Sequence, residues 1–217
     1  MTLNVDLYYT MRSPYCYLST PQLERLVKEY DIEIHLKPVF PLAVSDSTFF
    51  EKVNPLWPPY LLKDTARIAE RLSIPFHWPR PDPIVQDMKT RKVSKDQPYI
   101  RRLTCLAQVA AERGQGLDYV IAASALLFSP EVDGWHTGTQ LSDALVKKEL
   151  VLSELEEVVN NETERLEVAI HANRAAQLAA GHWGAPLFVF NSEIFFGRDR
   201  IEDLVWLLKK NGLKPRT

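Results

Sequence analysis

The residues best suited to chemistry stand near the start of the chain, where Ser13, Pro14, Tyr15 and Cys16 follow one another. They come directly after an apolar run over residues 3–9, which is typical of a buried strand, and they open an apolar segment with helical spacing. Ser13 and Pro14 suit the N-cap and the first position of that helix, and capping alone is the structural alternative for both. A helix N-terminus also offers unpaired N–H groups and a partial positive charge, which favour a bound thiolate or carboxylate.

The same segment differs in one position from a redox motif. A strand, a turn and a helix that carry Cys-x-x-Cys indicate a thioredoxin-like redox site. Here Ser13 takes the first cysteine position and only Cys16 remains. A two-cysteine disulfide cycle therefore cannot run within this motif. We predict instead that the site holds a thiolate brought by another molecule.

A second group of interest, Gly184-Ala185-Pro186, stands directly before an apolar run over residues 187–190. Proline is tolerated at the start of a strand, and a bond before proline is where a cis peptide is plausible. In a thioredoxin-like fold this turn faces the N-terminus of the first helix. Ala185 would then offer its backbone N–H and C=O groups to an extended peptide ligand. An ordinary trans start of the strand is the alternative.

A third group, Phe196-Gly197-Arg198-Asp199-Arg200, lies between the last predicted strand and the last predicted helix. Asp199 suits the N-cap of that helix, with Glu202 completing a D-x-x-E capping box. Alternatively, Asp199 binds the ammonium group of a ligand while nearby backbone N–H groups bind its carboxylate.

The elements that must position these groups follow from apolar periodicity. Strands are expected over residues 5–9, 32–36, 187–190 and 193–196, and helices over 14–30, 60–72, 98–112, 117–128, 139–148, 153–180 and 199–210. The simplest architecture is an α/β thioredoxin-like fold in which a βαβ half and a ββα half form one sheet. We predict that residues 1–50 and 181–217 form this domain and that residues 51–180 form a large helical insertion domain.

Composition excludes several classes of function. The chain has 217 residues, enough to bury a sizeable core, and a formal net charge of −2, which gives no basic field for nucleic acid. No apolar stretch approaches the roughly 18 residues of a membrane span. The first residues lack the basic region and cleavage pattern of a signal peptide, so a cytoplasmic location is expected.

The two cysteines, Cys16 and Cys105, lie far apart in sequence. A disulfide between them has no support in a reducing compartment, and buried, inert thiols are favoured. The five histidines show no ligand spacing with cysteines or carboxylates, so no metal site is predicted.

Taken together, three motifs resemble the DsbA-like glutathione enzymes, a group that comprises the kappa-class glutathione transferases and the 2-hydroxychromene-2-carboxylate isomerases. The motifs are Ser13-Pro14-Tyr15-Cys16-Tyr17-Leu18, Gly184-Ala185-Pro186 and Phe196-Gly197-Arg198-Asp199-Arg200. The resemblance covers nearly the whole chain, including the helical insertion. It implies a thioredoxin-like fold and glutathione as the cofactor.

The resemblance also implies roles for individual residues. Ser13 matches the serine whose hydroxyl stabilises the glutathione thiolate, and Asp199 matches the aspartate that meets the γ-glutamyl ammonium. Ala185, before a cis Pro186, matches the position whose backbone pairs with the cysteinyl part of glutathione. Arg198 replaces a residue that is often small and polar, and it either pairs with a ligand carboxylate or points to solvent.

A proline-bearing loop after the second strand also contacts ligand in the family. Here this loop makes Asn54 and Tyr60 candidates for binding glutathione. The acceptor pocket would be lined by the helical insertion, where the available aromatic residues are Trp57, Tyr60, Trp78 and Trp135. Cys16 is expected to face inward.

The leading hypothesis is therefore a glutathione-dependent isomerase of the 2-hydroxychromene-2-carboxylate type, acting through a thiolate that Ser13 stabilises. A kappa-like glutathione transferase uses the same thiolate and is the first alternative. A non-catalytic thioredoxin-like module that binds glutathione or a peptide is the second. Ser13 disfavours a thiol–disulfide oxidoreductase. The expected partners are a small aromatic or electrophilic substrate and, as in relatives, a second copy of the chain in a homodimer.

Overall fold

Segments from the first and the last part of the chain together form one mixed sheet. The computed structural model describes residues 2–46, 48–87, 89–90 and 92–216. The strands of the sheet lie in the order β2-β1-β3-β4. They are β1 (Leu3–Tyr9), β2 (Ile32–Pro38), β3 (Leu187–Phe190) and β4 (Glu193–Phe196). β1 pairs parallel with β2, whereas β3 pairs antiparallel with both β1 and β4. The predicted βαβ and ββα halves therefore meet in one thioredoxin-like sheet, as the sequence indicated.

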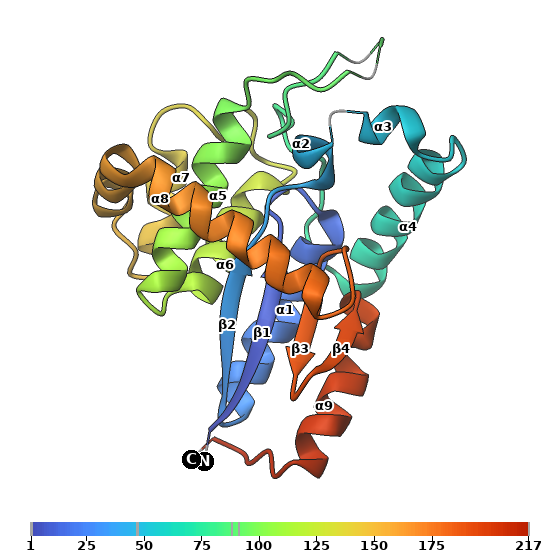
Figure 1. Ribbon diagram of the computed structural model, residues 1–217, viewed down its shortest axis with the longest axis vertical. Coiled ribbons are helices and arrows are strands. Elements are labelled where there is room, and N and C mark those ends of the chain that lie inside the picture. The colour runs from blue at the N-terminus through green and yellow to red at the C-terminus, as the bar shows by residue number, and fades with distance from the viewer. Residues whose placement is uncertain (1, 47, 88, 91, 217) are drawn as a thin grey trace.

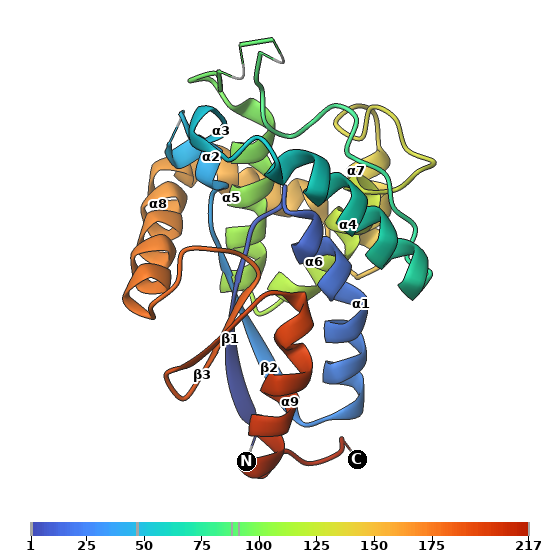
Figure 2. The same ribbon diagram turned by 90° about the vertical axis from the view of Figure 1, so that its right-hand side faces the viewer.

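Helices cover both faces of this sheet (Figures 1 and 2). On one face, α1 (Pro14–Glu29) connects β1 to β2, and α9 (Ile201–Lys210) follows β4 after the short 3-10 turn η1 (Arg198–Arg200). α8 (Leu152–Ala179) lies on the opposite face. The last predicted helix therefore begins at Ile201 and not at residue 199, because the turn η1 precedes it.

The segment between β2 and β3 is almost entirely helical, as predicted. Its helices are α2 (Leu42–Ser45), α3 (Phe49–Lys52), α4 (Trp57–Leu72), α5 (Pro98–Glu112), α6 (Gly116–Leu127), α7 (Gln140–Val146) and α8. The sequence did not predict α2 and α3, since four residues are too few to show helical periodicity. α4 begins at Trp57, before the predicted start, because prolines fit a first helical turn that needs no donor there. None of the described helices is both long and apolar enough to span a membrane.

The sheet and the helical segment share a hydrophobic core. Buried side chains of β1 and β3, such as Leu7 and Phe188, belong to the same cluster as those of α5, α6 and α8, such as Leu106, Tyr119 and Leu166. The division into a domain of residues 1–50 and 181–217 and an insertion domain of residues 51–180 stays a prediction.

A buried hydrogen bond ties β1 to the helical segment. The hydroxyl groups of Tyr9 and Ser124 lie 2.7 Å apart, and both side chains are almost fully buried. Tyr9 ends the strand that leads into the Ser13 segment, and Ser124 belongs to α6. This bond therefore fixes the end of β1 against a helix that lies far away in sequence.

We expect Tyr9→Phe to lower the free energy of unfolding by about 1–3 kcal/mol, because the Ser124 hydroxyl is left buried without its partner. Chemical denaturation measures this change. The matched control is Tyr8→Phe, since the Tyr8 hydroxyl makes no hydrogen bond to the described part of the chain. The double variant Tyr9→Phe/Ser124→Ala should cost less than the sum of the single variants. Equal losses for Tyr8→Phe and Tyr9→Phe would contradict this role.

Candidate functional site

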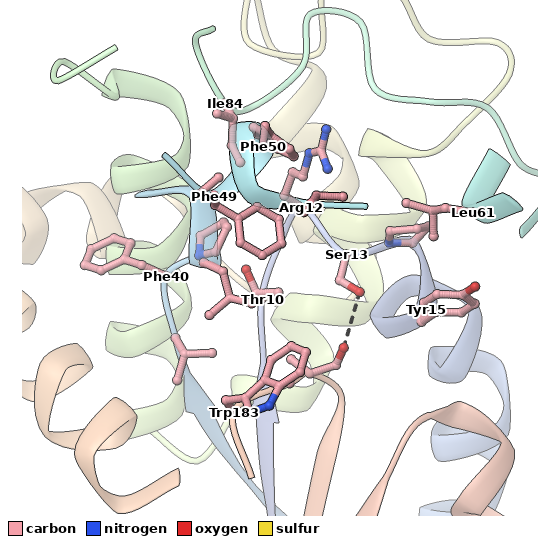
Figure 3. A pocket seen from close by; sticks show the side chains of 18 of the residues that line it. Thr10, Arg12, Ser13, Tyr15, Phe40, Phe49, Phe50, Leu61, Ile84 and Trp183 are labelled. Atoms are coloured by element: carbon pink, nitrogen blue, oxygen red, sulfur yellow. Dashed lines mark hydrogen bonds between the residues drawn. The ribbon is translucent and has the colours of Figure 1, made fainter. Parts of the chain in front are cut away.

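A pocket of about 590 Å³ opens at the N-terminus of α1 (Figure 3). Most of its wall is apolar, and it draws on the β1–α1 connection, the segment after β2, α3, α4, α8 and the turn before β3. Its lining residues are Thr10, Arg12, Ser13, Pro14, Tyr15, Val39, Phe40, Pro41, Leu42, Ala43, Phe49, Phe50, Val53, Asn54, Trp57, Leu61, Ile84, Arg174, Trp183, Gly184, Ala185 and Phe196. Figure 3 shows Trp183 at one end and Phe49 and Phe50 at the other. A site of this size and character suits a small organic ligand.

Ser13 is the N-cap of α1, as predicted. Its Oγ accepts a hydrogen bond from the Cys16 N–H at 3.3 Å, and Pro14 takes the first helical position. The same oxygen donates to the carbonyl of Ala185 over 3.5 Å (dashed line in Figure 3). That long contact is weak, so the Ser13 hydroxyl is available to a better acceptor. The hydroxyl and the helix N-terminus together favour a negatively charged ligand atom at this point.

The turn before β3 faces Ser13, as the sequence analysis expected. The Ala185–Pro186 bond is cis, so the alternative of a trans bond was wrong. The Ala185 amide makes no hydrogen bond within the described part of the chain, whereas the Pro186 carbonyl accepts from the Gly197 N–H at 2.9 Å. Ala185 thus presents an unpaired donor beside Ser13, which suits an extended ligand that pairs with the backbone.

Side chains of α8 and of the turn itself hold this turn in place, and sequence reasoning did not find them. The Gln177 amide donates to the Gly184 carbonyl at 2.6 Å, and Arg174 Nη1 donates to the Trp183 carbonyl at 2.6 Å. On the other side, the Gly184 N–H donates to His182 Nδ1 at 2.9 Å. Three side chains therefore fix the two peptide groups that precede Ala185.

Asp199 does not cap α9, so the capping alternative was wrong. The N-cap of α9 is Arg200, and no side chain caps that helix. Gly197, at φ 104°, turns the chain into η1 and displaces the start of α9 past Asp199. The Asp199 carboxylate is exposed and accepts from Arg200 Nη2 at 2.9 Å. It is free to exchange this surface partner for the ammonium group of a ligand.

Arg198 is half-buried beside Asp199 and does not point freely to solvent. Its Nε is buried and has no hydrogen-bond partner within the described part of the chain. Burial lowers the pKa of Arg198, and the nearby positive charge of Arg71 lowers it further. Arg198 and Asp199 line a separate hollow of about 390 Å³ between α1, the end of α4 and the start of α9, so the structure does not bring them into the wall of the Ser13 pocket.

Tyr15 links the pocket to the Asp199 region. It lines the Ser13 pocket, and its hydroxyl donates to Asp64 Oδ2 at 2.8 Å. Burial raises the pKa of the Tyr15 phenol, and the hydrogen bond to Asp64 and the charges of Asp64 and Asp199 raise it further. Tyr15 therefore stays protonated and lies within electrostatic range of Asp199.

The other two predicted glutathione contacts fall in different places. Asn54 lines the Ser13 pocket, where its Oδ1 accepts from the Leu56 N–H at 3.0 Å. Tyr60 is exposed and is not part of the pocket wall. Its hydroxyl lies 3.4 Å from Asp64 Oδ1, so it reaches the pocket only through the carboxylate that Tyr15 also binds.

The predicted aromatic lining is correct only in part. Trp57 lines the pocket, and Trp78 lines an adjoining hollow. The prediction that Trp135 lines the pocket was wrong. This side chain is buried in the core, and its Nε1 donates to the Pro81 carbonyl at 2.8 Å. Phe49 and Phe50 of α3 take the place in the wall that the sequence assigned to other aromatic residues.

Arg12 lines both the pocket and the adjoining hollow, and the sequence analysis did not identify it. Its guanidinium binds both carboxylate oxygens of Asp82, at 2.8 and 3.3 Å. It lies 5.5 Å from the ring of Phe50 and 5.6 Å from that of Trp78, within range of cation–π attraction. The charge of Arg12 is therefore already satisfied within the protein.

Both cysteines are free and buried, and Cys16 faces inward as predicted. Burial raises the pKa of the Cys16 thiol to about 12 and that of Cys105 to about 11. Neither thiol ionises near neutral pH, and the thiolate is the reactive form. Within the described ranges, no group of three or more His, Cys, Asp and Glu side chains is arranged to hold a metal ion.

His182 makes the turn sensitive to pH. Burial lowers its pKa below the ordinary value of 6.5, and its Nδ1 must be unprotonated to accept from Gly184. Because the folded chain holds this proton less tightly than the unfolded chain, the contribution to stability is full above about pH 6.5 and declines as the pH falls toward the lowered pKa.

We therefore expect His182→Asn to reduce the loss of unfolding free energy between pH 7.5 and pH 5. An asparagine oxygen can accept from the Gly184 N–H but does not titrate in this range. Denaturation curves at both pH values for the wild type and the variant measure the difference. Parallel losses in the two proteins would show that another group titrates.

Comparison with known proteins agrees with this fold. Solved structures that resemble the chain include a 2-hydroxychromene-2-carboxylate isomerase, with a TM-score of 0.70 and 19% identity over 96% of this chain and 95% of that chain. A probable DsbA oxidoreductase from Streptomyces coelicolor has a TM-score of 0.66 and 14% identity over 99% and 93% of the two chains. The cytosolic disulfide reductase DsbM from Pseudomonas aeruginosa, solved with GSH, has a TM-score of 0.59 and 14% identity over 96% and 98%.

No curated protein matches the chain by sequence. The low identities to the solved structures establish the fold that they share and not a common activity. The DsbA-like thioredoxin domain matches residues 4–209, a range that includes Ser13, the turn at Ala185 and Asp199. The chain thus belongs to the DsbA-like thioredoxin family.

Proposed function

We propose that the chain is a glutathione-dependent isomerase of the 2-hydroxychromene-2-carboxylate type. The observation that carries this proposal is the position of the Ser13 hydroxyl. It lies at the N-terminus of α1, faces the Ala185 carbonyl and opens into a pocket with apolar walls. A thiolate bound there receives a hydrogen bond from Ser13 and lies in the field of the helix N-terminus, and both lower the pKa of a thiol.

The reactive sulfur must come from outside the chain. Cys16 lies one turn into α1, where burial raises its pKa to about 12, and Cys105 lies in α5. Neither is among the residues that line the Ser13 pocket. A tripeptide thiol can instead reach Ser13 by pairing its backbone with the free donor of Ala185.

The residues around the pocket fit such a ligand. With the sulfur at Ser13 and the cysteinyl backbone at Ala185, the γ-glutamyl ammonium would reach Asp199, which lines the separate hollow and lies within electrostatic range of Tyr15 in the pocket wall. Thr10 adds a buried hydroxyl oxygen in the pocket wall that has no partner among the described residues. A buried polar atom without a partner is costly, and a bound ligand would satisfy it.

An isomerase of this type needs a place for a thiolate, at Ser13, and an apolar surface for the acceptor beside it. When bound, glutathione supplies a thiolate that adds to a conjugated double bond of the acceptor and leaves after rotation, so no atom is gained or lost overall. Ser13 holds the negative charge on the sulfur before addition and after departure. Phe40, Phe49 and Trp57 provide apolar surfaces that hold an aromatic acceptor next to Ser13.

A kappa-like glutathione transferase is the second candidate. The size of the pocket, about 590 Å³, supports it, because apolar walls of this extent accept many electrophiles. Similarity to a 2-hydroxychromene-2-carboxylate isomerase along nearly the whole chain favours the isomerase. We further propose a cytoplasmic location, which matches the cytosolic reductase DsbM among the structural neighbours, and a homodimer.

The test is a calorimetric titration with glutathione followed by two activity assays. We expect binding at millimolar glutathione or below, glutathione-dependent isomerisation of 2-hydroxychromene-2-carboxylate, and weaker conjugation of a generic aryl halide. Conjugation without isomerisation would select the transferase. Absence of binding at millimolar glutathione would remove both enzymes and leave the non-catalytic module.

For Ser13→Gly we expect turnover to fall by about tenfold to a hundredfold while glutathione affinity changes far less. A hydrogen bond to a charged group contributes roughly 1.5–3 kcal/mol, which corresponds to this range if thiolate formation limits the rate. Glycine is chosen because it costs a helix cap only a few tenths of a kcal/mol. Ser13→Thr keeps the hydroxyl and is the control. Unchanged turnover in Ser13→Gly with glutathione saturating would rule out thiolate stabilisation by Ser13.

The double variant Cys16→Ala/Cys105→Ala should retain glutathione-dependent activity, since the reacting sulfur belongs to the ligand. Cys16 is fully buried, so some loss of stability is expected, and alanine is milder than serine at such a site. Activity is measured on folded protein that binds glutathione. If that protein were inactive, a protein thiol would take part and a redox mechanism would have to be considered again.

A further inference from the structure

Arg174 of α8 is a half-buried arginine in the wall of the Ser13 pocket. Its Nη1 donates to Gln177 Oε1 at 2.7 Å and to the Trp183 carbonyl at 2.6 Å. Its Nε and Nη2 make no hydrogen bond within the described part of the chain. No described carboxylate forms an ion pair with it, whereas Arg12 at another side of the pocket binds Asp82 at two points.

An unpaired guanidinium in an apolar wall favours an anionic ligand. Arg174 is half-buried and forms no ion pair within the described part of the chain, and burial lowers its pKa. Attraction between charges is stronger where apolar walls exclude water. The remaining N–H groups of the planar fork match the two oxygens of a carboxylate.

The position of Arg174 relative to Ser13 is fixed. Gln177, to which Arg174 donates, is fully buried and itself donates to the Gly184 carbonyl. Arg174 and Gln177 therefore hold the peptide groups directly before Ala185, which faces Ser13. A ligand carboxylate on Arg174 is thus held at a defined place relative to the sulfur site, which is what a specificity residue requires.

We propose that Arg174 is the carboxylate-binding residue of the acceptor half of this pocket, so that the chain selects acceptors with a carboxylate on an apolar, aromatic body. The aromatic body would lie against the ring of Trp183, which lines the pocket (Figure 3) and whose backbone carbonyl accepts from Arg174. The statement about acceptors rests on the proposed function, whereas the preference of Arg174 for a carboxylate does not require glutathione chemistry.

A carboxylate on Arg174 has two sources, the acceptor and the glycyl end of glutathione. Titration of each protein with glutathione and with its glycyl ethyl ester separates them. If the acceptor is the source, Arg174→Gln leaves the affinity for glutathione and the ratio between glutathione and its ester unchanged. If the wild type prefers glutathione to its ester and Arg174→Gln loses that preference, Arg174 binds the glycyl carboxylate of glutathione, and the acceptor proposal is overturned.

The main experiment measures the binding of coumarin-3-carboxylate and of its uncharged ethyl ester, in the absence of glutathione, by fluorescence titration. The wild type should prefer the acid by about tenfold or more, the difference expected of a hydrogen-bonded charge pair. Arg174→Gln should bind both probes about equally, and Arg174→Lys should restore part of the preference because it keeps the charge without the fork. Arg113→Gln removes an exposed charge outside the pocket wall and is the matched control.

The ratio of acid to ester separates charge recognition from structural support. Loss of the contact to the Trp183 carbonyl would weaken both probes equally and leave the ratio unchanged, and that result would overturn the proposal. Failure of both probes to bind the wild type at millimolar concentration would overturn it as well. Because the titration contains no glutathione, an Arg174-dependent preference in a chain that does not bind glutathione would remove only the proposed function.

Discussion

The antiparallel pairing of β1 with β3 is the constraint on which the site depends. In this register Tyr8 lies opposite Leu187, so the residues that follow β1 and those that precede β3 meet at one end of the sheet. The start of α1 and the Ala185 turn are therefore placed face to face by the backbone ladder. The Ser13 hydroxyl lies between them, next to the helix N-terminus and the unpaired Ala185 amide. A shift of this register would move the Ser13 hydroxyl away from the Ala185 amide.

The helical segment turns this sheet edge into a pocket. α3 and α4 supply apolar side chains on one side, and the end of α8 supplies Arg174 on another. The same segment stabilises the sheet elements that carry the chemistry, through the Tyr9–Ser124 bond at β1 and the Gln177–Gly184 bond at the turn. In the proposed function, acceptor selection and the preorganisation of Ser13 and the Ala185 turn thus depend on the same helices, whose buried side chains share one core with the sheet.

Features written in short stretches of sequence were predictable, and features created by packing were not. The Ser13 cap, the β3–β4 hairpin and the proline turn at Ala185 each depend on a few adjacent residues whose backbone preferences are strong. Trp135 was misplaced because aromatic composition does not say whether a side chain faces a pocket or the core. Arg174 was missed because α8 is long and polar on several faces, and only its contact with the turn before β3 identifies the face that lines the pocket. Asp199 was judged an N-cap or a ligand contact, and the turn after Gly197 removed the first alternative.

Replacing the first cysteine of a redox motif by Ser13 changes what the site can do. A buried Cys16 with a pKa of about 12 offers no thiolate at neutral pH, so the helix N-terminus and the Ser13 hydroxyl have no protein thiol to activate. In the proposed function the same groups stabilise a thiolate supplied by a diffusible ligand, which leaves unchanged after it has added to an acceptor. The chain then keeps no oxidised state that a second enzyme must reduce. In the proposed function its selectivity comes from the acceptor side of the pocket, where Arg174 forms no ion pair with a carboxylate in the described part of the chain.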